Sequence, residues 1–250
     1  MPRPRATSLE QVRSLWVYYG AGHEAQLRGH DLLIVQAPLY GPAGVGRLRS
    51  GGALVLGYLS VGEDHRPAGS EVYHRRVNPL WGSSLVEVAH PAWQQHVQQQ
   101  ARYALQECGC DGLLLDTLDS GEPATTARLV QELRRTFPQA LLLANRGFGL
   151  LERLRPSLNG VLFEAFSTTW ENGCKAHTAS GLHYTARELA RVRQLGLPVL
   201  AIDYAPPGQQ HGPLASFARR RAEAYGLVGC VSTRSLDSLP EPGGAYKGAS

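Results

Sequence analysis

The chain has 250 residues and carries 25 basic and 21 acidic side chains, which give it a formal net charge of +4 and a pI near 9.0. Its hydrophobic content of 43% suffices for one large core, and no stretch reaches the ~18 consecutive apolar residues of a membrane-spanning helix. Composition therefore excludes a helical membrane protein and favours a globular one, built as one large barrel or as two small domains.

Eight apolar segments bounded by turn residues recur along the chain. Most are continuously apolar rather than alternating, which is typical of parallel strands covered on both faces. The predicted strands span 15–19, 31–36, 53–60, 112–116, 140–146, 160–166, 198–204 and 226–232.

Segments with apolar residues at helical spacing lie between these strands. The patterns predict helices at 91–108, 125–137, 185–196 and 213–226, and weaker helices at 22–29 and 41–50. Thr185, followed by Glu188 three residues later, predicts a capping box at the start of the helix at 185–196.

This alternation of strands and helices over about 230 residues predicts a (β/α)8 TIM barrel. We expect a single domain over 1–250, with a core at about 14–236 and a flexible tail at 237–250. A doubly wound open sheet is the alternative fold. No G-x-G-x-x-G motif follows the first strand, however, and we interpret the glycine cluster at 41–46 as a loop.

Other features bear on partners and location. Arginines are dense at 187–194 and 217–224, but without interleaved aromatic residues they predict solvated helix faces rather than a nucleic-acid surface. The N-terminal residues lack the apolar segment of a secretory signal, so the sequence as it stands predicts a cytoplasmic protein, or a secreted one whose signal has been removed. The four cysteines show neither C-x-x-C nor zinc spacing. The oligomeric state stays open.

Polar side chains gather where the predicted strands end. In a barrel of this kind the carboxyl ends of the strands build the active site. A single aspartate there is usually a cap or a turn residue, but acids end four of the eight strands, which indicates an acidic pocket. The candidate pocket residues are Tyr18, Tyr58, Glu63, Asp116, Asp119, Asn145, Arg146, Glu164, Asp203 and Tyr204.

Such a pocket suits glycoside hydrolysis, because two carboxylates on either side of the bond can stabilise its cationic transition state. Aromatic residues of the same rim, including Trp81 and Trp170, could stack on sugar rings. A Schiff-base aldolase is disfavoured because neither Lys175 nor Lys247 lies on a strand. The histidines are scattered over loops and helices, so we expect no zinc site and no cofactor. A metal-dependent lyase or isomerase using Mg²⁺ remains an alternative.

Five segments resemble glycoside hydrolase family 114, the endo-α-1,4-polygalactosaminidases, with a closer likeness to the bacterial branch that includes a barrel protein of Thermotoga. The segments are YLSVGE (58–63), CDGLLLDTLDS (110–120), NRGF (145–148), VLFEAF (161–166) and LAIDY (200–204). The resemblance implies a (β/α)8 barrel that cleaves α-1,4-linked galactosamine-containing polysaccharide. An oligo- or polysaccharide is then the expected partner, and neither nucleic acid nor membrane is expected.

The resemblance also implies an essential aspartate at the end of the fourth strand and a glutamate on the sixth, which map onto Asp116 and Glu164. Further pocket positions of the family map onto Glu63, Asp119, Asn145, Asp203 and Tyr204. We expect Asp116 to act as nucleophile and Glu164 as general acid/base in a retaining reaction, with carboxyl groups about 5–5.5 Å apart.

Two electrostatic expectations accompany this hypothesis. The neighbouring carboxylate and the apolar setting of Phe163 and Phe166 should raise the pKa of Glu164. The acids of the rim should favour the cationic amino group of galactosamine, although the whole chain is mildly basic. A carbohydrate-binding barrel without turnover is the alternative to a hydrolase, and a nucleotide-binding role is disfavoured because the sequence shows no phosphate cradle.

Overall fold

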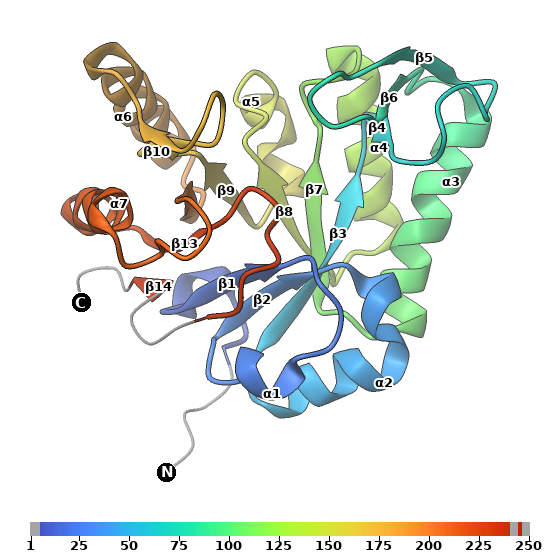
Figure 1. Ribbon diagram of the computed structural model, residues 1–250. Helices are drawn as coiled ribbons and strands as arrows, with labels where there is room; N and C mark the ends of the chain where they lie inside the picture. Colours follow the sequence, from blue (N-terminus) through green and yellow to red (C-terminus); the bar gives the residue numbers. More distant parts are fainter. Residues whose placement is uncertain (1–5, 241–244, 247–250) are drawn as a thin grey trace.

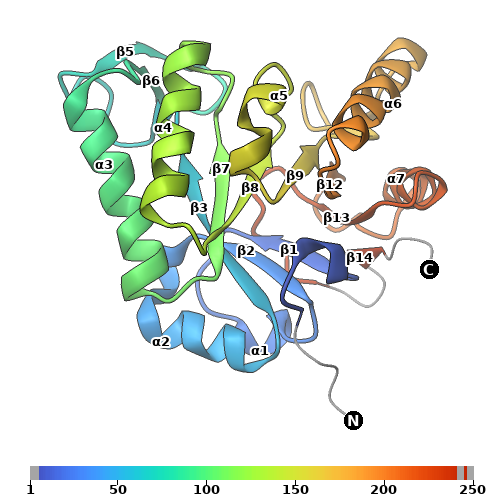
Figure 2. The same cartoon turned by 180° about the vertical axis from the view of Figure 1, so that it is seen from behind.

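The computed structural model describes residues 6–240 and 245–246. Parallel strands form a nearly closed barrel in the order in which they occur in the chain, with helices outside it, as Figure 1 and the reverse view in Figure 2 show. The fold is therefore the predicted (β/α)8 barrel. The eight barrel strands are β1 (Leu15–Tyr18), β2 (Leu32–Val35), β3 (Leu54–Ser60), β7 (Gly112–Asp116), β8 (Leu141–Asn145), β9 (Gly160–Glu164), β12 (Val199–Tyr204) and β13 (Val228–Ser232).

Helices follow the strands and cover the outer face of the barrel (Figure 2). Several begin at a proline, whose fixed φ suits the first turn and whose missing N–H would be unpaired there anyway. Short turns of 3-10 helix at Leu9–Gln11 and Arg155–Ser157 and a π-helical turn at Tyr103–Glu107 accompany them. The helices are α1 (Glu24–Leu27), α2 (Ala37–Ser50), α3 (Pro91–Arg102), α4 (Pro123–Thr136), α5 (Leu151–Leu154), α6 (Ala179–Gln194) and α7 (Pro213–Ala224).

The barrel closes between β1 and β13, and within the described residues these two strands are not paired by backbone hydrogen bonds. The chain that follows β13 bonds to β1 instead. The Tyr19 N–H donates to the Leu236 carbonyl at 2.7 Å, and the Trp16 indole N–H donates to the Ser238 carbonyl at 3.0 Å. The short strand β14 (Ala245–Tyr246) pairs antiparallel with β13. The remaining part of the predicted flexible tail, 241–244 and 247–250, lies outside the described residues.

A small three-stranded sheet between β3 and α3 was not predicted. It consists of β4 (Glu63–Asp64), β5 (His74–Val77) and β6 (Ser84–Val86), with β6 in the middle of antiparallel pairs. A second small ribbon pairs β10 (Thr168–Thr169) with β11 (Lys175–Ala176) after β9. Both lie beyond the carboxyl ends of the barrel strands (Figure 1), so they belong to the same end as the predicted pocket. We call the segment 61–90 the β4–β6 insert.

Helix α6 begins six residues before its predicted start, and the predicted capping box is wrong. The Thr178 hydroxyl caps the helix by accepting the Gly181 N–H at 3.2 Å. Thr185 and Glu188 lie buried in the helix interior, where the Thr185 hydroxyl donates to the Leu182 carbonyl. The sequence pattern placed the start of the helix too late, because the residues of the first turns of α6 are too exposed to show apolar periodicity.

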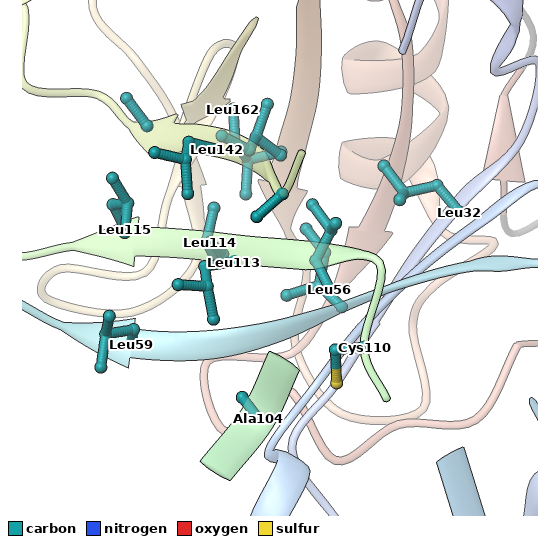
Figure 3. Packing of buried hydrophobic residues seen from close by; sticks show 14 of the residues in the cluster. Leu32, Leu56, Leu59, Ala104, Cys110, Leu113, Leu114, Leu115, Leu142 and Leu162 are labelled. Atoms are coloured by element: carbon teal, nitrogen blue, oxygen red, sulfur yellow. The ribbon is translucent and has the colours of Figure 1, made fainter. Parts of the chain in front are cut away.

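Leucine and valine side chains fill the barrel and the layer between strands and helices. Figure 3 shows leucines of β3, β7, β8 and β9 packed against one another. Burial of this apolar area is the main source of stability, at about 25 cal/mol per Å². None of the helices described is long and apolar enough to cross a membrane.

Candidate active site

A cavity of about 610 Å³ opens at the carboxyl ends of the barrel strands. Barrel-strand residues that line it come from the same face of each strand. Successive side chains of a strand point to opposite faces, so Leu114 and Asp116 both face the lumen while Leu113 and Leu115 face the helices. The same alternation directs Leu162 and Glu164 inward, and Ile202 with Tyr204.

Asp116 and Glu164 lie close together at the base of this cavity. A single nitrogen, Asn145 Nδ2, donates to Asp116 Oδ1 and to Glu164 Oε2 at 2.8 Å each. These two oxygens are therefore at most about 5.6 Å apart, twice the length of one bond, near the separation typical of retaining glycosidases. β8 lies between β7 and β9 in the sheet, so Asn145 at its end is placed to reach both.

Each carboxylate also accepts a phenol hydroxyl. Tyr58 Oη donates to Asp116 Oδ2 at 3.0 Å, and Tyr204 Oη donates to Glu164 Oε1 at 2.6 Å. Burial raises the pKa of both phenols, and the nearby carboxylates raise it further. The two tyrosines therefore stay protonated at neutral pH and can act as donors to either carboxylate.

The pKa of Asp116 is raised, first by burial and then by the charge of Glu164. Hydrogen bonds from Asn145 and Tyr58 oppose the rise, because they stabilise the ionised form. Two carboxyl groups this close repel when both are ionised, so the pair holds one proton more readily than an isolated aspartate would. Such a pair contains both an acid and a base.

The backbone beside Asp116 is fixed by Thr117, which adopts a left-handed conformation with φ of 59°. Its hydroxyl accepts the Val61 and Gly62 N–H groups at 3.1 and 2.8 Å. A Cβ on Gly62 would lie 2.4 Å from the Thr117 carbonyl oxygen, so this close approach of β7 and the β4–β6 insert requires glycine. The conformation of Thr117 is thereby held, and with it the end of β7.

Glu63 is 5% exposed and holds the β4–β6 insert to the loop after β7. Its carboxylate accepts the Ser83 hydroxyl at 2.5 Å, the Ser120 hydroxyl at 2.6 Å and the Asn78 amide at 3.2 Å. The carboxylate also borders the cavity. These bonds use most of the lone pairs of the carboxylate and hold the cavity wall together.

Asp203 is fully buried and does not line the cavity. Its Oδ1 accepts the Ser167 and Thr168 N–H groups at 2.6 and 2.8 Å, and burial raises its pKa. These bonds fix the chain just after Glu164, where Ala165 has a left-handed φ of 55°. Asp203 therefore fixes the backbone next to Glu164 without lining the cavity itself.

The structure brings seven of the ten candidate residues to the cavity and leaves three outside its lining. Tyr58, Glu63, Asp116, Asn145, Arg146, Glu164 and Tyr204 line it. Tyr18 and Asp203 point to the opposite face of their strands, and Asp119 is exposed on the loop after β7.

The cavity also contains residues that were not among the candidates. Tyr19 lines it in place of Tyr18 and packs edge-on against Tyr58, with ring centroids 5.1 Å apart. No sequence signal could have identified Tyr19, because its strand is apolar on both faces and shows no alternation. His65, His177 and Arg234 line the cavity from loops, where no periodic pattern marks them.

Phe163 and Phe166 do not form the apolar surroundings of Glu164 that the sequence predicts. Phe163 and Phe166 belong to a separate apolar cluster on the outer side of β9, which includes Leu189 and Ala218 of α6 and α7. Phe163 alternates with Glu164 along the strand and so points away from the lumen. Among the described residues, no group of three or more His, Cys, Asp or Glu side chains is arranged to hold a metal ion.

Comparisons with known proteins add a family and a set of similar folds. The sequence model described as glycoside-hydrolase family GH114 matches residues 31–242. The glycoside hydrolase domain of PelA from Pseudomonas aeruginosa is 29% identical with a TM-score of 0.81, covering 90% of this chain and 96% of that one. No curated protein matches the chain.

Two more distant structures share the fold alone. Ega3 from Aspergillus fumigatus, in complex with galactosamine, is 12% identical with a TM-score of 0.64 and covers 92% of this chain and 94% of that one. An α-amylase from Geobacillus thermoleovorans, complexed with acarbose, is 8% identical with a TM-score of 0.53, and the match covers 77% and 61% of the two chains.

Proposed function

The chain belongs to glycoside-hydrolase family GH114, and from this premise we propose that it cleaves galactosamine-containing polysaccharide with Asp116 and Glu164 as the reacting carboxylates. One observation carries the assignment of these two residues. Both accept a hydrogen bond from Asn145 Nδ2, so they face each other across a gap that suits one glycosidic bond. The α-1,4 linkage rests on the family resemblance.

The proposed reaction retains the configuration of the anomeric carbon. Asp116 attacks that carbon while Glu164 gives its proton to the glycosidic oxygen, so the carbon–oxygen bond breaks and the leaving hydroxyl departs neutral. Water then gives a proton to Glu164 as its oxygen attacks the same carbon, and Asp116 is released. A separation of at most about 5.6 Å between the bridged oxygens supports this course over inversion, which needs room for a water between the groups.

Asn145, Tyr58 and Tyr204 would preserve the geometry through both steps. Their donors are aimed at the carboxylates, so little reorganisation accompanies the change of charge. The raised pKa of Asp116, which the charge of Glu164 helps to raise, supports a single proton held between the two carboxyl groups. In the proposed complex that proton lies on Glu164, which leaves Asp116 ionised as nucleophile.

The substrate proposal is supported by the family and by the solved complex of Ega3 with galactosamine. Charge supports it locally, since Asp116 and Glu164 place negative charge at the base of the cavity. Of the five acids expected to attract an amino sugar, Asp119 and Asp203 do not line the cavity, whereas Arg146 and Arg234 do. We therefore expect an ammonium group to be favoured beside the carboxylate pair rather than throughout the cavity.

The test is a panel of α-1,4-linked galactosaminoglycans that range from fully deacetylated to fully acetylated, with starch as a control polymer. Mass spectrometry of the products should show new reducing ends from the galactosamine polymers. Asp116→Asn and Glu164→Gln should each abolish this release, while Asp119→Asn, outside the cavity, should retain it. Binding without release by the native chain would indicate a carbohydrate-binding barrel, and release by either carboxylate variant at the native rate would remove that residue from the mechanism.

A further inference from the structure

Three side chains from three different loops meet at the mouth of the cavity. The Arg234 guanidinium lies over both indole rings, with its central carbon 4.7 Å from the Trp81 centroid and 4.4 Å from the Trp170 centroid. The two indoles meet each other edge-on at 4.8 Å, and Arg234 Nη2 donates to the Leu80 carbonyl at 2.6 Å. We call Trp81, Trp170 and Arg234 the aromatic bridge.

The bridge joins loops that leave the barrel at well-separated strands. Trp81 lies in the β4–β6 insert after β3, Trp170 directly follows β10 after β9, and Arg234 follows β13 by two residues. In the strand order, β7 and β8 lie between β3 and β9. On the other side of the barrel, β2 and β1 lie between β3 and β13. Figure 1 shows the insert and the β10–β11 ribbon on opposite sides of the barrel end, and Trp81, Trp170 and Arg234 meet in the lining of the cavity at that end.

All three bridge residues line the same cavity as Asp116 and Glu164. The guanidinium already occupies a face of each indole, so those faces are not available to stack on a sugar. The bridge therefore differs from an open aromatic platform. It is a contact within the cavity lining, in which one guanidinium lies against both indole rings.

We infer that the aromatic bridge closes over the cleft, so that a polysaccharide is held as a chain threaded beneath it. This inference rests on the proposed hydrolase function and concerns how the polymer enters the site. A threaded chain must enter by a free end or wait until the bridge opens. Chain segments without a nearby free end are then poor substrates, and a bound chain leaves slowly.

The experiment compares two forms of one polymer, partly deacetylated α-1,4-galactosaminoglycan, either linear or chemically cross-linked into a gel that has few free ends. The measured quantity is the rate on the gel divided by the rate on the linear polymer, which cancels any change in intrinsic turnover. Arg234→Ala and Trp170→Ala should each raise this ratio about fivefold or more, because an opened cleft admits internal segments.

Arg146→Ala is the matched control. Arg146 is another arginine of the same cavity that stacks on an aromatic ring, Phe148, at 5.5 Å, but it takes no part in the bridge. Its removal should leave the ratio within about twofold of the native value, whatever it does to the rate itself. Trp81, Trp170 and Arg234 are at least partly exposed, so their variants should fold, which thermal unfolding can verify.

The outcomes separate the two proposals. An unchanged ratio in the bridge variants of an enzyme that cleaves the linear polymer overturns the threading inference and leaves the hydrolase function intact. Polymer binding without cleavage contradicts the proposed hydrolase function alone. In that case the threading inference is tested by the rate at which a long polymer dissociates from the protein. We expect this rate to rise about tenfold or more in Arg234→Ala, and equal rates in the native protein and the variant would contradict the inference. If the native protein neither cleaves nor binds the polymer, both the hydrolase function and the threading inference are contradicted.

Discussion

Asp116 and Glu164, 48 positions apart in the chain, accept hydrogen bonds from one and the same nitrogen atom at 2.8 Å each. A shared donor fixes the distance between two carboxylates more firmly than two separate donors would, because movement of either group lengthens its own bond to a common point. This arrangement places Asn145 at the centre of the candidate site and motivates the first prediction.

Asn145→Ala should lower kcat/KM by about 10²–10³-fold, the effect typical of removing one preorganised donor at a reacting group. The variant loses the bridge between the carboxylates, so Asp116 and Glu164 are free to separate. Steady-state kinetics on a soluble galactosamine polymer measures the loss. Asn159→Ala, which removes an asparagine from the opposite end of β9, is the control and should change stability rather than turnover. Native-like kcat/KM in Asn145→Ala would show that the shared donor is dispensable.

The roles of the two carboxylates can be assigned by chemical rescue. With azide present, a variant that lacks the acid/base should form a glycosyl azide of retained configuration, since azide attacks the covalent intermediate without needing a base. A variant that lacks the nucleophile should give the inverted azide, because azide then attacks the sugar directly. We expect retention from Glu164→Ala and inversion from Asp116→Gly, read from the anomeric NMR signals. The reverse pattern would exchange the two roles.

The free energy of unfolding should depend on pH in the way that the raised pKa of Asp116 implies. Aspartate in an unfolded chain has a pKa of about 3.9. The folded chain therefore binds more protons at Asp116 between that pH and the raised pKa. This side chain contributes stability that is fully present below about pH 4 and is lost as the pH rises through the raised pKa. Asp203, whose pKa burial raises, contributes with the same sign.

Asp116→Asn should accordingly have a larger free energy of unfolding than the native chain at pH 7, and the difference should shrink as the pH approaches 4. Urea denaturation at several pH values measures it. Asp119→Asn, an exposed aspartate three residues away, should show no such pH-dependent difference. A native chain that is the more stable of the pair at pH 7 would contradict the raised pKa.

Glu63 should prove to be a stabilising residue. Glu63→Ala leaves the Ser83 and Ser120 hydroxyls and the Asn78 amide without their acceptor, and Ser83 is fully buried. We expect a loss of about 2–4 kcal/mol in the free energy of unfolding, and a smaller loss for Glu63→Gln, which keeps one oxygen acceptor. Urea denaturation gives both values. A raised KM with unchanged stability would instead assign Glu63 to the binding of sugar.

Much of the fold could be predicted from the sequence because parallel strands covered on both faces are continuously apolar and end abruptly in polar residues. All eight predicted barrel strands are present, and Asp116, Asn145 and Glu164 end three neighbouring ones. The short strands of the β4–β6 insert escaped prediction, since two or three residues carry no measurable period and β5 is largely exposed.

The same continuous hydrophobicity hid which residues face the lumen. Tyr18 and Tyr19 are equivalent in a strand that is apolar on both faces, and so are Asp203 and Tyr204, yet only Tyr19 and Tyr204 line the cavity. The direction of each side chain depends on how the strand is registered against its neighbours, which is a property of the closed sheet.

By itself the sequence determined the class of fold, the strand ends that carry polar residues and the motifs that mark the family. Only the tertiary structure decided that one amide joins Asp116 to Glu164 and that Arg234 lies over two indoles that contact each other. The physical reason is that hydrophobic periodicity records burial along a single strand or helix. Contacts between residues that are far apart in the chain arise when the barrel closes, and no local pattern encodes which loops then meet.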